Sequence, residues 1–283
     1  MMEIKHRTSG ETLITLDAES LVGADLNHYE LQGADLHGMD LSGANLQGSN
    51  LSGADLEGTD LEGANLKNAI LRKANLRGAD LDGAALGDGV PGNAAILAEC
   101  CLQDARITSC DMQFVDLRSA DLSRSSLSRT DLHNARLEQA NLREAVVGSA
   151  LMIDTDLRGA DLREAYFCNV HLNGANLSGA SLDGAKLGGE DCIPAILNRA
   201  VMIRTSLVGA RLCGVSLLRV DLSNANLTDA DLSEAVLTGA ILRKTNLTRT
   251  NLEDVDLTTT TLTLANLSAA KNVYLKYPKR DAR

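Results

Sequence analysis

The sequence is poor in aromatic side chains and in proline. Phe, Tyr and Trp together make up 2% of its 283 residues, Trp is absent, and there are only 3 Pro. Hydrophobic residues nevertheless account for 44% of the chain. Large rings would not fit a narrow interior, so this composition favours a thin core filled by Leu and Ala.

Membrane-spanning and secretory segments are also missing from the pattern. No apolar run reaches the eighteen or so residues of a membrane-spanning helix. The N-terminus, MMEIKHR, lacks the apolar region of a signal peptide. We therefore expect a soluble, cytoplasmic protein that does not enter a membrane.

Motifs that carry chemistry are absent as well. The five His show no HxxxH or HExxH spacing, the six Cys show no CxxC spacing, and no GxSxG nucleophile elbow occurs. Asp recurs so regularly that carboxylate pairs arise by construction and do not indicate acid–base catalysis. The sequence predicts no catalytic residue, no cofactor, no metal site and no disulfide framework.

What the chain does contain is a period of five. Residues 53–66 read GADLEGTDLEGANL, with Leu at every fifth position and a small residue two places before each Leu. A step of five smears apolar positions around a helix, and an odd step sends them to alternate faces of a strand. The glycines suit tight corners. Each unit is therefore a short extended piece followed by a corner, with Leu and the small residue pointing inward.

This period covers almost the whole chain. It runs from Leu16 to Leu86, resumes one residue out of phase by Leu102, and continues from Leu197 to Leu267. Such an internal repeat indicates a solenoid in which each unit buries its apolar side against its neighbours.

The units ADLHG at 34–38, ANLQG at 44–48, ADLEG at 54–58 and ANLSG at 175–179 resemble the A(D/N)LXX motif of the pentapeptide-repeat family. The resemblance implies an all-β fold, a right-handed quadrilateral parallel β-helix with four pentapeptides per coil of twenty residues. We expect about 12 to 13 coils, which at about 4.8 Å per coil make a rod of roughly 60 Å.

The domain limits follow from the repeat and its interruptions. We expect an N-terminal cap hairpin at 1–15, turning around Ser9 and Gly10, and a β-helix at 16–270. A C-terminal cap and basic tail at 271–283 would place Val273, Leu275 and a Tyr over the last coil. Irregular stretches at 87–93 and 188–194 interrupt the repeat.

The first irregular stretch contains a GxGxxG pattern at 87–92. No βαβ unit surrounds it and Pro91 removes an amide donor, so we interpret it as a glycine-rich detour and not as a nucleotide site. In one geometry, each stretch leaves the rod and the coil resumes at Leu102 and Met202, which places the two excursions on opposite sides. In the favoured geometry, the coil resumes at Leu97 and Leu197, and both detours protrude from the same side.

Acidic residues are expected to align, because residues twenty apart stack on neighbouring coils. The chain carries 38 acidic against 27 basic residues, a net charge of −11, which disfavours direct binding of nucleic acid. The residues of the predicted acidic strip are Asp35, Asp40, Asp55, Glu57, Asp60, Glu62 and Asp80.

The family resemblance gives this strip a second interpretation. Some pentapeptide-repeat proteins mimic duplex DNA and bind type II topoisomerases, protecting them from inhibitors. The members best known for this often carry Phe at the central position and pair through a C-terminal helix, whereas this chain has only Phe114 and Phe167 and no such helical pattern. The alternative is a solvated face that keeps the protein soluble.

Apolar residues at outward positions form a second candidate surface. Val146 and Tyr166 are twenty apart and therefore adjacent, with Leu151 and Ile153 close by. Exposed apolar clusters often mark partner surfaces, although a neighbouring loop or a self-contact could equally cover this one.

The sequence thus predicts a non-catalytic protein–protein interaction scaffold that presents a rigid acidic rod. The alternative is a DNA mimic that protects DNA gyrase or topoisomerase IV. The identity of the partner and the choice between monomer and homodimer stay open.

Overall fold

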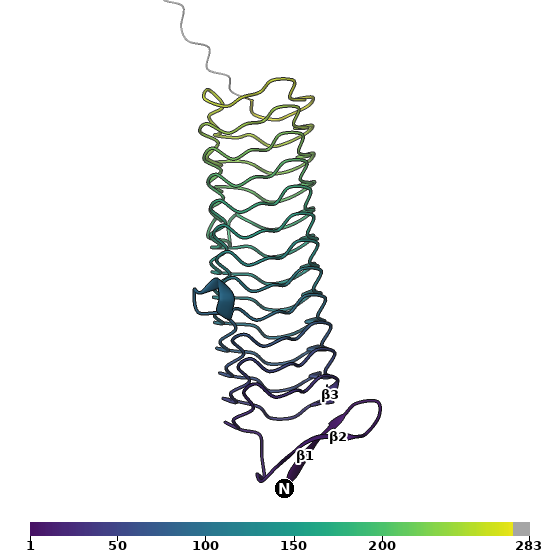
Figure 1. The fold of residues 1–283 in the computed structure, drawn as a ribbon. Helices are drawn as coiled ribbons and strands as arrows, with labels where there is room; N and C mark the ends of the chain where they lie inside the picture. The colour runs from purple at the N-terminus through teal and green to yellow at the C-terminus, as the bar shows by residue number, and fades with distance from the viewer. Residues whose placement is uncertain (274–283) are drawn as a thin grey trace, which may run out of the picture.

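The computed structural model describes residues 1–273, and these form a right-handed quadrilateral parallel β-helix (Figure 1). The coils stack into one rod, and almost all pairing is through single-residue parallel bridges. The regular elements are β1 (Met2–His6), β2 (Thr12–Leu16), β3 (Ala34–Asp35) and the 3-10 helix η1 (Pro91–Asn93).

The unit around Leu56 shows how five residues make one side of a coil. Ala54 and Leu56 are fully buried, and the amide of Leu56 donates to the carbonyl of Asn75 in the next coil at 2.7 Å. Gly58 makes the corner with φ of +64°, a conformation that glycine adopts without strain. Asp55 Oδ1 accepts the amide of Glu57 at 3.2 Å and so closes the turn. Each recurring type of residue in the repeat therefore has a structural role: the small residue fits the core, the Asp closes the turn, and the Gly makes the corner.

Parallel bridges define four faces, which we call A to D, each with one bridging residue per coil. Face A contains Asp25, Asn45, Asn65, Ala85, Asp111, Asp131, Leu151, His171, Ile196, Ser216 and Val236. Face B contains Glu30, Asn50, Ile70, Ile96, Asp116, Arg136, Asp156, Asn176, Val201, Asp221, Ile241 and Thr261. Face C contains Asp35, Asp55, Asn75, Cys101, Asp121, Asn141, Asp161, Ser181, Ser206, Asn226, Asn246 and Asn266. Face D contains Asp40, Asp60, Asp80, Arg106, Ser126, Val146, Tyr166, Lys186, Arg211, Asp231, Asn251 and Lys271.

The N-terminal hairpin lies across the first coil (Figure 1). β1 pairs antiparallel with β2 on one side and with β3 on the other, and Ile4 is fully buried. This arrangement pairs backbone groups at the end of the rod that would otherwise be free to pair with other chains. At the other end, Val273 packs against the core, and the rest of the expected C-terminal cap lies outside the described residues.

Both irregular stretches are detours that leave the ladder intact. Ile70 pairs with Ile96, 26 residues on, and His171 with Ile196, 25 residues on, instead of the usual 20. The amides of Ala95 and Ala195 donate to the carbonyls of Leu86 and Leu187, each at 2.8 Å. The coil is therefore regained at Leu97 and Leu197, and the geometry with resumption at Leu102 and Met202 is wrong.

The expectation that both detours protrude from the same side is also wrong. The first detour, residues 87–94, leaves between faces A and B, and the second, residues 188–194, leaves between faces D and A. The hundred residues between corresponding points include five extra residues of a detour, so the chain advances nineteen pentapeptide steps and not twenty. The detours therefore leave at neighbouring corners, one on each border of face A.

Glycine starts each detour because the chain there passes close to the next coil. A Cβ at Gly87 would overlap the carbonyl oxygen of Gln113, and a Cβ at Gly188 would overlap that of Cys213. Both obstacles are backbone atoms and cannot rotate away.

Candidate interaction surfaces

The residues of the predicted acidic strip lie together on two faces. Asp40, Asp60 and Asp80 are consecutive on face D, and Asp35 and Asp55 are consecutive on face C. Asp40 accepts hydrogen bonds from the hydroxyl of Ser42 at 2.7 Å and from its amide at 3.0 Å. These bonds lower the pKa of Asp40 below its ordinary value, so its charge persists into mildly acidic solution.

Arg106 ends the strip on face D. Its Nη1 lies 2.6 Å from Asp80 Oδ2, and its Nη2 contacts Asp82. The carboxylate of Asp80 raises the pKa of Arg106 further, so the guanidinium stays charged. The acidic strip is therefore confined to the coils that precede Arg106 and does not follow the length of the rod.

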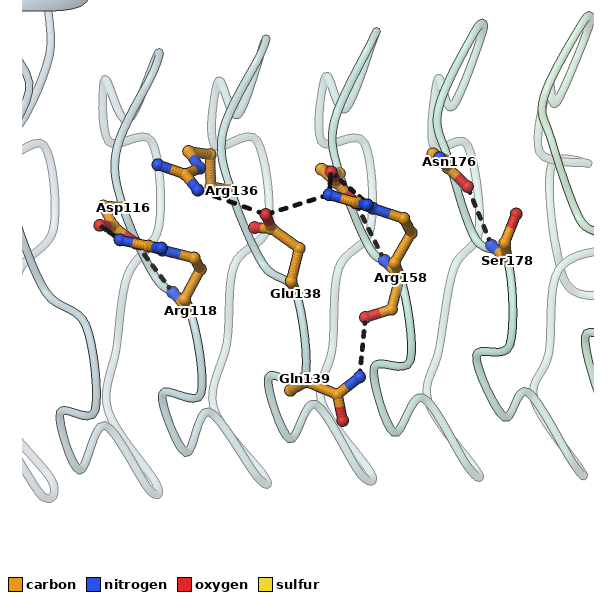
Figure 2. Close-up of polar contacts among 9 residues, drawn as sticks. Asp116, Arg118, Arg136, Glu138, Gln139, Arg158, Asn176 and Ser178 are labelled. Carbon is orange, nitrogen blue, oxygen red and sulfur yellow. Dashed lines mark hydrogen bonds and ion pairs between the residues drawn. The ribbon is translucent and has the colours of Figure 1, made fainter.

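Face B carries both signs of charge in alternation (Figure 2). Arg118 binds Asp116 of its own unit, with 2.6 Å between Nη2 and Oδ2, and Arg158 does the same with Asp156. Glu138 Oε1 lies between Arg136 and Arg158, at 3.5 and 3.3 Å. Charges on this face therefore pair within and between coils, although Glu138 Oε2 is buried without a hydrogen-bond partner among the described residues.

The apolar cluster lies near the corner between faces D and A. Val146 and Tyr166 bridge each other on face D, and Leu151 follows on face A. Val146 is 42% exposed and Leu151 37% exposed, whereas Tyr166 and Ile153 are half-buried. The structure thus places Val146, Tyr166 and Leu151 around this corner, whereas Ile153 lies two residues beyond Leu151, at the corner between faces A and B.

The second detour covers part of this cluster and adds to it. The hydroxyl of Tyr166 donates to the carbonyl of Asp191 at 3.3 Å, and the backbone amide of Asn169 donates to the carbonyl of Ile193 at 2.7 Å. Ile193 itself is 66% exposed. The loop therefore covers Tyr166, while Val146 and Leu151 stay exposed. We call Val146, Leu151, Tyr166 and Ile193 the apolar patch; Ile153 is not part of it.

A disulfide between Cys168 and Cys192 fastens this detour, which corrects the expectation of no disulfide. Cys168 lies at a corner of the preceding coil, and Cys192 lies in the detour. Their separation of 24 residues has no recognisable spacing, because it depends on how far the detour folds back. Disulfides are typical of oxidising compartments, and the cytoplasmic location stays a prediction.

Thiol labelling should sort the cysteines by this geometry. Burial raises the pKa of Cys100 and of Cys110 to about 12, so both stay protonated and inaccessible at pH 8. Cys101 and Cys213 are half-buried free thiols. Iodoacetamide followed by peptide mass analysis should modify Cys101 and Cys213 in the folded protein, Cys100 and Cys110 only after unfolding, and Cys168 and Cys192 only after unfolding with reduction. Labelling of Cys192 without reductant would contradict the disulfide.

The fold and these surfaces define a solenoid protein whose regular exterior presents side chains on a rigid frame. The family model described as pentapeptide repeats matches residues 20–58, 49–88, 110–146, 150–189, 195–233 and 230–268. The chain belongs to the pentapeptide-repeat family. A comparison with curated proteins found no match.

Several solved structures are similar to this chain. HetL, a pentapeptide-repeat protein involved in heterocyst differentiation regulation in the cyanobacterium Nostoc, is 30% identical, with a TM-score of 0.43, over 71% of this chain and 86% of its own. QnrB1, a plasmid-mediated fluoroquinolone resistance protein, is 19% identical, with a TM-score of 0.28, over 71% of this chain and 90% of its own. A protein of the Arabidopsis thaliana thylakoid lumen is 31% identical, with a TM-score of 0.23, over 44% of this chain and 68% of its own. Within residues 1–273, no helix is long and apolar enough to cross a membrane.

Proposed function

We propose that this protein is a non-catalytic interaction scaffold that binds a protein partner through the apolar patch. One observation carries the proposal: Val146, Leu151 and Ile193 expose apolar side chains beside a loop that a disulfide fastens to the rod. Apolar side chains exposed in one region of a surface are typical of a partner site, and loops held by rigid scaffolds often carry function.

Rigidity supports the proposal on energetic grounds. Neighbouring coils hold this backbone on both sides: the carbonyl of Val146 accepts from the amide of Leu127 in the preceding coil, and the amide of Val147 donates to the carbonyl of Tyr166 in the following coil. A partner that docks here does not have to order the backbone first, so less of its contact energy is offset by lost conformational freedom.

Serine substitutions test the patch against a matched control. Val146→Ser with Leu151→Ser should weaken capture of the partner from lysate of the native host by at least about tenfold, because the apolar contact is lost. The control pair, Val236→Ser with Ile241→Ser, removes side chains of 43% and 37% exposure elsewhere on the rod, and should bind like the wild type. Equal binding by both variants would contradict the proposal.

A second candidate function rests on the acidic strip. The ladder of Asp40, Asp60 and Asp80 supports the hypothesis that the strip imitates DNA phosphates and protects DNA gyrase or topoisomerase IV. Reversing all three to Lys should then abolish protection of the enzyme in a supercoiling assay with an inhibitor, while circular dichroism stays unchanged. Absence of protection by the wild-type protein would exclude this candidate and leave the patch proposal untouched.

A further inference from the structure

One histidine lies beside two carboxylates of the acidic strip. His37, Asp55 and Glu57 each offer a ligand atom, and the three atoms lie within 4.8 Å of one another. Asp55 and Glu57 belong to one unit, and His37 occupies the same position as Glu57 one coil earlier. His37 is about one coil away from Asp55 and Glu57 along the chain, so no short sequence motif contains all three residues.

Asn75, one coil beyond, holds both carboxylates in place. Its Nδ2 donates to Asp55 Oδ1 and to Glu57 Oε2, each at 3.0 Å. No hydrogen bond from another described residue occupies Asp55 Oδ2, Glu57 Oε1 or the His37 imidazole, and neither carboxylate forms an ion pair there. One amide thus orients two ligands and leaves one oxygen of each available, as the outer partners of metal ligands commonly do.

The surroundings favour a cation. Asp35 lies next to Asp55 on face C, and Asp40 and Asp60 lie on the adjoining face D. Two carboxylates that share one neutral donor repel each other, and a divalent ion between them would relieve this repulsion. Imidazole as the third ligand favours a transition metal over magnesium or calcium, which prefer all-oxygen sites.

We propose that His37, Asp55 and Glu57 form a binding site for a first-row transition-metal dication, with zinc as its representative. Three protein ligands leave one position of a zinc tetrahedron open to water or to a donor atom of a bound protein. This inference goes beyond the proposed function, and it replaces the sequence-based expectation of no metal site.

Calorimetric titration of the full chain with zinc chloride tests the site, with His37→Ala against His133→Ala. His133 is the matched control because it occupies the same position of its unit and contacts one carboxylate, with 2.5 Å between Nδ1 and Asp131 Oδ1, but has Gln113 and Ile153 as its neighbours along the rod. One zinc per chain should bind to the wild type and to His133→Ala, and His37→Ala should lose at least about tenfold in affinity.

X-ray absorption spectroscopy at the zinc edge, on the equimolar complex, supplies a second measurement by identifying the atoms that surround the metal. Only nitrogen and oxygen should surround the metal, and Asn75→Leu should weaken binding without changing these ligands, because it removes only the orienting amide. A sulfur ligand would assign the metal to a cysteine and overturn the proposal. Unchanged affinity in His37→Ala, or calcium binding as tight as zinc binding, would also overturn it, since the surface would then be an unspecific collector of cations.

Discussion

Phe167→Ala is expected to lower the free energy of unfolding by about 3 to 5 kcal/mol. Phe167 is fully buried and occupies an inward position that Leu fills in most coils. Truncation to a methyl group leaves a cavity that stacked coils cannot close, because the interstrand hydrogen bonds on either side of it fix their spacing. The amide of Phe167 itself donates to the carbonyl of Lys186 at 2.8 Å.

Urea unfolding followed by circular dichroism measures this change, with Phe114→Ala as the control. Phe114 is half-buried at a corner with φ of 62°, so the same truncation there should cost about 1 kcal/mol or less. A Phe167→Ala midpoint no lower than that of Phe114→Ala would mean that the core repacks, contrary to the rigid ladder described above.

Replacing residues 188–194 with Asp-Gly is expected to weaken partner binding while the rod still folds. Leu187 and Leu197 then stand five residues apart, so the ladder continues without a change of register. The replacement removes Ile193 and uncovers Tyr166, and so takes away the part of the apolar patch that the loop provides. Partner affinity measured by surface plasmon resonance should fall at least about tenfold, which corresponds to about 1.4 kcal/mol.

The first detour provides the control. Replacing residues 87–94 with Asp-Gly restores the five-residue spacing between Leu86 and Leu97 in the same way, but at the corner between faces A and B. Binding should be unchanged there, because that detour does not touch the patch. Loss of binding in both variants, or in neither, would contradict a partner site at the second detour.

The sequence predicted the repeating unit because the residues within each pentapeptide determine its local conformation. Ala54 and Leu56 had to face inward, and Asp55 and Gly58 had to make the turn, from residue type and spacing alone. The twenty-residue coil came from the family resemblance, and it placed Asp40 beside Asp60 and Val146 beside Tyr166, as the ladder has them.

The detours show where counting along the chain stops being sufficient. The small-then-large pairs Ala95/Leu97 and Ala195/Leu197 located the return of each chain to the coil. The side on which each detour leaves depends on how many residues lie outside the ladder. The hundred residues between corresponding points of the two detours include five that do not belong to the repeat. Hydrogen bonds between coils decide this number, and they involve residues far apart in the sequence.

What the sequence by itself determined is the repeat, its inward and outward positions, and the places where it is interrupted, because all of these depend on interactions within five or ten residues. Only the tertiary structure decided that Arg106 ends the acidic strip, that Cys168 meets Cys192, and that His37 meets Asp55 and Glu57. Each of these contacts joins side chains from different coils. Rotamers and loop paths set them within a few ångströms, a precision that a period of five does not encode.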